Sequence, residues 1–505
     1  MEIVLNYLHQ LTACSSKYSI AVIDLDYFIR FCIRFSDQTI ERIKQSIWEF
    51  FRQEMGGYIW QESPGDDQYY CVFPDVDSDA CAGKIEDLRQ RFRKQHFLKN
   101  IEGYEKTRMN FSAGVSGYPD HGNCLGDVIR YAIVALNQAK ALRRGRVVVY
   151  PQKVQVESSR VLYDTHAEID VVLGDYGFSG GVVEGKIPCN QVYLSEPQSI
   201  AIDENIIYVA DQNTHSVLAI QDGMVKRVAG CGVFGNSENG GKADRSYLNK
   251  PTGIAVFNRI LYITDTGNDQ VKAVDLETGL IQCIAGCGQP GYTGDGGSAT
   301  SASLNKPGGI DVDQFGNIYI NDIANNVIRR VDAKGIISTY AGSGKYGFSG
   351  DGGCALSASL GEIYGLCVNR RTGDLYLADY FNHRIRVVYR NSGIIDTVIG
   401  SGTSGYSGDG SPPLIACIDR PVAVCLDKHE NILIAESGNN CVRILDVTKQ
   451  RVYTLAGSGK MGVETGKDIA KFQFANPNGL AIGNKGEIYV LDGSNNRVCK
   501  INFRR

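Results

Sequence analysis

A repeat that runs through the C-terminal two-thirds constrains this chain more than any other feature. A short segment of the form Y-[VIL]-x-D, or a close variant of it, recurs every 54 to 57 residues. The six copies are YVAD (208), YITD (262), YIND (319), YLAD (376), LIAE (433) and YVLD (489). A period of this length is typical of β-propeller blades, in which each repeat folds as one small antiparallel sheet.

Each repeat also carries the same neighbouring parts. A segment of the type P-x-G-I-A precedes the acidic strand, and two further short apolar strands follow it, with Gly and Asn between them. Such short, β-branched, alternating strands predict antiparallel blades. Six units predict six blades. The last unit lacks its fourth strand, and we expect residues near 169–173 to supply it, which would close the ring and leave no exposed sheet edge.

The repeat resembles that of NHL-repeat β-propellers. The resemblance implies an all-β six-bladed disc whose variable loops bind a ligand or a protein partner that the sequence does not name. The recurrent acids Asp265, Asp322, Asp379 and Asp492 are expected to be structural acceptors of backbone N–H groups. The acids of the GDG loops are open to two interpretations, a turn residue or a cation ligand; they are Asp295, Asp351 and Asp409.

The first 150 residues have a different rhythm, with few glycines and an alternation of strands and helices. Residues 19–24 predict a buried strand, residues 37–55 an amphipathic helix, and a hairpin is expected around the turn PGDD at 64–67. Helices and strands then alternate to residue 150. This order predicts an α/β domain with a mixed sheet.

Acidic residues lie at two turns of this predicted sheet. Asp24 ends the first strand, and Asp66 and Asp67 form the hairpin turn. If the two strands are neighbours, these carboxylates converge. Carboxylates arranged in this way hold Mg²⁺ (or Mn²⁺) in enzymes that transfer phosphoryl groups.

The order of motifs resembles the GGDEF family of nucleotide cyclases, with some likeness to CRISPR-polymerase palm domains. The corresponding segments are VIDLDYF, PGDDQ, FSAGVSGYP, ALNQAKALRRGR and VVVY. The resemblance implies a palm fold, a metal bound by Asp24, the Leu25 carbonyl, Asp66 and Asp67, and catalysis by the three aspartates. It also implies a nucleotide site made of Phe28, Cys32, Glu41, Gly65, Lys140, Arg144 and Arg146.

The resemblance predicts an enzyme that condenses two nucleoside triphosphates into a cyclic dinucleotide. GTP is the default substrate and ATP the alternative, since Cys32 stands where the family has an Asn that contacts guanine. Each domain would hold one triphosphate, so a homodimer or higher oligomer is expected, with the propeller as its sensor. Two alternatives remain. An inert cyclase-like domain could act as a nucleotide receptor or dimerisation module beside a binding propeller. A propeller enzyme with its site in the channel is disfavoured, because the sequence shows no clustered non-repeating acids or histidines.

These interpretations divide the chain into a cyclase-like domain (1–150), a linker (151–168) and a propeller (169–505). A net charge of −4 and a pI of about 6.0 argue against general nucleic-acid binding. No apolar run is long enough to span a membrane, and the N-terminus lacks the pattern of a secretory leader. The fifteen cysteines are scattered without a C-x-x-C pair, which favours reduced thiols and a cytoplasmic location.

Overall fold

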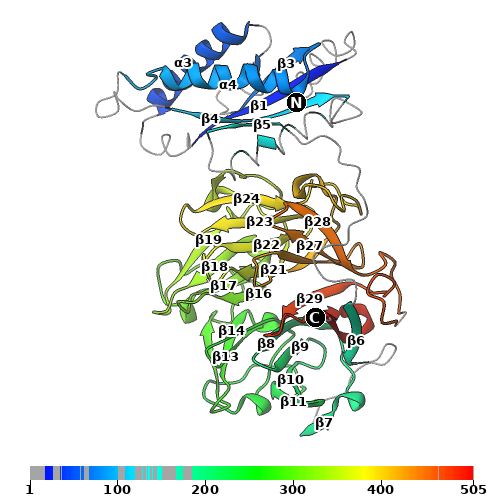
Figure 1. Ribbon diagram of the computed structural model, residues 1–505. Helices are drawn as coiled ribbons and strands as arrows, with labels where there is room; N and C mark the ends of the chain where they lie inside the picture. The colour runs from blue at the N-terminus through cyan, green and yellow to red at the C-terminus, as the bar shows by residue number, and fades with distance from the viewer. Residues whose placement is uncertain are drawn as a thin grey trace. The chain divides into compact units, whose positions relative to one another are not determined.

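The computed structural model divides the chain into two compact units, residues 1–157 and residues 158–505 (Figure 1). Within them the structure describes residues 17–26, 35, 37–56, 59–61, 68–99, 109–119, 128, 132, 135–136, 139, 145–149, 167–174, 185–463 and 466–503.

The described part of the first unit is a five-stranded sheet with helices. The strand order is β2-β3-β1-β4-β5, in which only β4 and β5 run parallel to each other. The elements are β1 (Tyr18–Leu25), α3 (Asp37–Met55), β2 (Ile59–Gln61), β3 (Gln68–Pro74), α4 (Ser78–Lys94), β4 (Phe111–Tyr118) and β5 (Val147–Val149).

Alternation along the central strand β1 produces two buried faces. Ile23 packs with Ile47 and Phe51 of α3 and with Phe92 of α4 in one core cluster. Ile20 and its alternate neighbours pack on the opposite face in a second cluster. A strand that is buried on both faces reads as a continuous apolar run, which explains the segment YSIAVIDL.

The second unit consists of six sheets of four or five strands, each an antiparallel blade. The first three blades contain β7 (Lys186–Pro188), β8 (Pro197–Asp203), β9 (Ile206–Asp211), β10 (Ser216–Gln221), β11 (Met224–Ala229); β12 (Pro251–Phe257), β13 (Ile260–Asp265), β14 (Gln270–Asp275), β15 (Ile281–Ala285); β16 (Pro307–Val312), β17 (Ile318–Asp322), β18 (Val327–Val331) and β19 (Ile337–Ala341).

The remaining blades follow the same order. They contain β20 (Gly353–Cys354), β21 (Ile363–Val368), β22 (Leu375–Asp379), β23 (Arg384–Tyr389), β24 (Ile394–Ile399); β25 (Pro421–Leu426), β26 (Ile432–Glu436), β27 (Cys441–Asp446), β28 (Arg451–Ala456); β29 (Pro477–Ile482), β30 (Ile488–Asp492), β31 (Arg497–Phe503) and β6 (Ala167–Leu173).

The blades form a closed ring. The innermost strands contact one another in the order β8, β12, β16, β21, β25, β29 and back to β8. In the last blade β6 pairs antiparallel with β31, so that Ile169 lies opposite Ile501 and Leu173 opposite Val498. The last sheet is therefore built from both ends of the unit, and the predicted all-β propeller architecture is confirmed.

Candidate functional site

The metal site predicted in the first unit falls only partly within the described residues. Asp24 is 5% exposed near the end of β1 and lies opposite Gln68 and Ser112 in the sheet. Leu25 is buried, whereas Glu41 and Arg146 are exposed. The other predicted residues lie outside the described part: Phe28, Cys32, Gly65, Asp66, Asp67, Lys140 and Arg144.

The neighbouring acid, Asp26, has a clear structural role. Its Oδ1 accepts a hydrogen bond from Ser112 Oγ at 2.6 Å, and its Oδ2 accepts one from the backbone N–H of Gly145 at 2.9 Å. Among the residues that the structure describes, no three His, Cys, Asp or Glu side chains lie close enough together to hold a metal ion.

In the propeller, the recurrent acids belong to a buried polar network that repeats from blade to blade. In the third blade Asp322, at the end of β17, accepts the backbone N–H of Asn305 at 2.7 Å and the side-chain amide of Asn325 at 2.8 Å. The same Asn325 amide also donates to the carbonyl of Gly291 at 2.8 Å. The network therefore ties the loop between two blades to the turn after β17.

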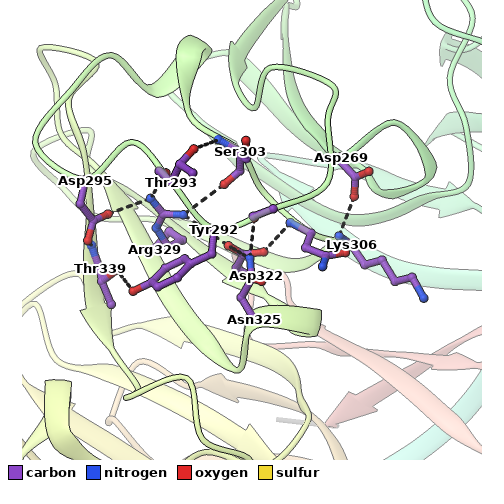
Figure 2. Close-up of polar contacts among 12 residues, drawn as sticks. Asp269, Tyr292, Thr293, Asp295, Ser303, Lys306, Asp322, Asn325, Arg329 and Thr339 are labelled. Carbon is purple, nitrogen blue, oxygen red and sulfur yellow. Dashed lines mark hydrogen bonds and ion pairs between the residues drawn. The ribbon is translucent and has the colours of Figure 1, made fainter.

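A buried arginine completes this network. Arg329 of β18 donates to Asp295 at 2.7 Å and to the carbonyl of Thr293 at 2.9 Å, and it also contacts Asp322 (Figure 2). The Tyr292 ring lies 5.1 Å from its guanidinium carbon. Burying a guanidinium is tolerated when its charge is paired and most of its N–H groups are bonded. Here both Nη1 and Nη2 of Arg329 have partners, and Nε is buried without one.

The aspartates of the GDG loops therefore have a structural role. All three accept hydrogen bonds from buried arginines in the same way, at 2.7 Å in each case; the pairs are Asp295–Arg329, Asp351–Arg386 and Asp409–Arg443. The prediction that the recurrent acids accept backbone N–H groups also holds, since Asp265 and Asp492 bind the N–H groups of Asn249 and Ala475.

The network varies among blades. The position seven residues after the acid holds arginine in the third, fourth and fifth blades. The second blade has Lys272 there, and the first blade has Leu218, which carries no charge. Asp211 of the first blade instead binds the Ser195 N–H and the Thr214 hydroxyl. Burial raises the pKa of Asp211 to about 7, because these hydrogen bonds only partly offset the loss of water.

The loops anchored by this network expose large apolar side chains. Phe234, Tyr346 and Met461 each precede the glycine whose carbonyl accepts the repeated asparagine amide, and they are 69%, 58% and 68% exposed. Tyr292, Phe348 and Tyr406 occupy a second equivalent position and are 41% to 49% exposed. These six side chains form what we call the loop face, because every such loop leads into the start of an innermost strand.

The centre of the propeller is a channel with a volume of about 790 Å³, lined by the innermost strands. At the fifth position of these strands the lining is not uniform. It comprises Ala201, Ala255, Asp311, Cys367, Cys425 and Ala481 in blade order. Three consecutive blades thus present polarisable or charged groups, whereas the other three present alanine.

The polar side of the channel departs from the repeat, and the sequence analysis missed it. One acid that departs from the repeat was overlooked, because Asp311 replaces the alanine of the P-x-G-I-A segment. Burial raises the pKa of the Asp311 carboxyl, and the nearby charge of Arg370 lowers it. Aligning the six segments position by position would have revealed this residue.

The closed ring of antiparallel blades and its repeated network define a β-propeller. A model of the NHL repeat matches residues 474–501, and a model described as the teneurin NHL domain matches residues 282–349. The predicted resemblance to NHL-repeat propellers is therefore confirmed for this part of the chain.

Curated relatives agree with this class. NHL repeat-containing protein 2 from Homo sapiens is 25% identical over 345 residues, which cover 60% of this chain and 46% of that protein. Protein SUPPRESSOR OF QUENCHING 1, chloroplastic, from Arabidopsis thaliana is 26% identical over 331 residues, which cover 62% of this chain and 31% of that protein. The chain thus spans less than half the length of these relatives.

A solved structure shares the fold. An auxiliary nutrient binding protein from Bacteroides thetaiotaomicron matches with a TM-score of 0.50 and 14% identity, covering 88% of this chain and 87% of that chain.

The prediction of a nucleotide cyclase is wrong. The matches point to NHL-repeat proteins and teneurins and do not indicate a cyclase or support a palm domain. The motifs that suggested a cyclase are short, and many unrelated α/β units share the order of strands and helices in which they lie. No observation tests the associated expectations of Mg²⁺, nucleoside triphosphates and a homodimer. No helix in the described part of the chain is both long and apolar enough to cross a membrane.

Proposed function

We propose that the propeller is a binding module that recognises a protein partner through the loop face. One observation carries this proposal: large apolar side chains recur at equivalent exposed positions of the loops that lead into the innermost strands. Exposed apolar side chains that recur at the same position of successive loops are more than single scattered residues, and exposed apolar surface that several loops share is typical of interaction sites.

The support beneath these side chains favours binding over flexibility. The amides of Asn268, Asn382 and Asn495 hold the loop carbonyls at 2.7 to 2.9 Å directly next to Phe234, Tyr346 and Met461. Side chains on a loop held in this way lose little additional freedom when a partner binds. Preorganisation of this type strengthens binding because less entropy is lost on association.

The chemistry of the loop face favours a protein rather than a small ligand. Aromatic residues and Met are enriched at the centres of protein interfaces, where they supply most of the binding free energy. The exposed residues are also distributed over loops that belong to several blades. Such a distribution suits a partner that is broad enough to contact several loops at once.

Site-specific photocrosslinking of the full chain tests the proposal. A photoreactive phenylalanine analogue replaces Tyr346 on the loop face or, as a control, Phe315 in the turn between β16 and β17, at the opposite end of the innermost strands; Phe315 is 57% exposed. We expect a discrete crosslinked protein from position 346 and not from position 315. Equal crosslinking at both positions, or none at position 346, would contradict the proposal.

A further inference from the structure

The polar side of the channel carries a second inference, which is independent of the loop face. Its central group is Asp311 on β16. The equivalent positions of the other innermost strands, which also line the channel, are three alanines and the thiols of Cys367 and Cys425. The repeat does not require a carboxylate at this position, because the equivalent residues of three other blades are alanines.

The hydrogen bonds of Asp311 leave part of its capacity unused. Oδ1 accepts the N–H of Val312 at 2.8 Å, and Oδ2 accepts the N–H of Val368 on the neighbouring innermost strand at 2.8 Å. These two bonds fix the orientation of the carboxylate. An ionised carboxylate can accept about four hydrogen bonds, so about two acceptor sites remain for a donor in the channel.

A guanidinium lies at the channel mouth above this carboxylate. Arg370, in the turn after β21, donates Nη2 to the carbonyl of Val256 at 3.3 Å, and its guanidinium carbon lies 5.6 Å from the centre of the Phe257 ring. Arg370 therefore reaches from the fourth blade to the second and is held there. The other mouth arginine, Arg371, is already neutralised by an ion pair with Glu430.

Asp311 and Arg370 influence each other electrostatically but do not form an ion pair. Among the described residues, the contacts of Arg370 are with the Val256 carbonyl and the Phe257 ring, and no salt bridge joins it to Asp311 or to another carboxylate. Two opposite charges held in fixed positions at a distance, inside a cavity, are complementary to a ligand that carries the reverse pair of charges.

The geometry points to a binding site for a small zwitterion of the amino-acid type, with its ammonium group at Asp311 and its carboxylate at Arg370. The alanine side of the channel, formed by Ala201, Ala255 and Ala481, accommodates an apolar side chain. The volume of about 790 Å³ lies within the range of small-molecule pockets.

Calorimetric titration of the full chain with three matched probes tests this inference. The probes are L-leucine, isoamylamine (which lacks the carboxylate) and isocaproate (which lacks the ammonium group). We expect leucine to bind at least about ten-fold more tightly than either of the other two, because each of those engages only one of the two charged groups. Equal binding of the amine and leucine, or no leucine binding, would overturn the inference.

Two variants and one control locate the site. Asp311→Asn and Arg370→Gln should each weaken leucine binding by about ten-fold or more. In the Asp311→Asn variant the new amide N–H would face a backbone N–H, so the thermal unfolding of this variant is measured as well. Arg370 is exposed, so the Arg370→Gln variant should fold normally. Arg259→Gln is the control, since Arg259 pairs with Glu277 away from the channel lining. Leucine affinity that is unchanged by Arg370→Gln would overturn the inference.

Discussion

Asp322 and Arg329 are both fully buried, and Oδ2 of the aspartate lies 3.4 Å from Nη1 of the arginine. The same relationship recurs between Asp379 and Arg386 in the next blade. Each pair lies where the turn of a blade meets the loop that leads into it. The repeated charges of this propeller therefore stabilise the loops rather than take part in chemistry.

Removing the cation from one of these pairs should destabilise the propeller strongly. We expect Arg329→Met to lower the free energy of unfolding by about 3 kcal/mol or more, because Asp295 and Asp322 lose their partner while Asp322 stays buried. Urea denaturation measures the change. Lys334→Met, at an exposed position, is the matched control and should change stability by less than about 0.5 kcal/mol. Equal effects of the two substitutions would show that the arginine is not structural.

The acid of the first blade should make stability depend on pH. Because burial raises the pKa of Asp211 to about 7, the folded protein keeps its proton at pH values where the unfolded chain has lost it. The stabilisation from this group is complete below pH of about 4, the usual aspartate pKa, and is lost as the pH rises towards 7.

Asp211→Asn should remove this dependence. The amide oxygen can still accept the Ser195 N–H, and the Thr214 hydroxyl can turn to accept from the amide N–H. We therefore expect the variant to be more stable than the native chain at pH 7.5 by on the order of 2 kcal/mol, with little difference at pH 4.5. Unfolding measured at the two pH values checks this. If the variant and the native chain differ in stability by the same amount at pH 4.5 and pH 7.5, the raised pKa assigned to Asp211 is wrong.

The strand that completes the last blade should contribute substantially to stability. Leu173 of β6 is 1% exposed in the core of the first and last blades, whereas Val171 on the same strand is 40% exposed. We expect Leu173→Ala to lower the free energy of unfolding by about 2–5 kcal/mol and Val171→Ala by less than about 1 kcal/mol. Comparable losses in denaturant titrations would mean that β6 does not pack as described.

Much of the propeller could be predicted from the sequence, because its signals are local. The segment YIND falls in β17, and the strand expected near 169–173 corresponds to β6. The buried arginines were missed for a physical reason. Arg329 donates to Asp295, 34 residues earlier in the chain, so its role depends on a long loop rather than on its neighbours.

The first unit shows the opposite limit of sequence analysis. The strands and helices that the structure describes there follow the predicted order, and Ile47 and Phe51 are buried on α3, the helix expected at residues 37–55. The cyclase activity predicted for it was wrong. A carboxylate at the end of a strand can bind a metal or, as Asp26 does, hold a neighbouring hydroxyl and backbone N–H. The channel residue Asp311 shows that a functional candidate can also lie inside a repeat, where a change at one position is easily overlooked.

The affinity of the full chain for the partner captured at position 346 tests the central claim most directly. The measurement compares the native chain, a variant with Phe234→Ser, Tyr346→Ser and Met461→Ser, and the control Phe315→Ser. We predict that the triple variant binds at least about 100-fold more weakly while the control binds normally, since exposed aromatic anchors supply most of an interface's binding free energy. If the triple variant binds as tightly as the native chain, or if Phe315→Ser weakens binding equally, the loop face is not the binding surface.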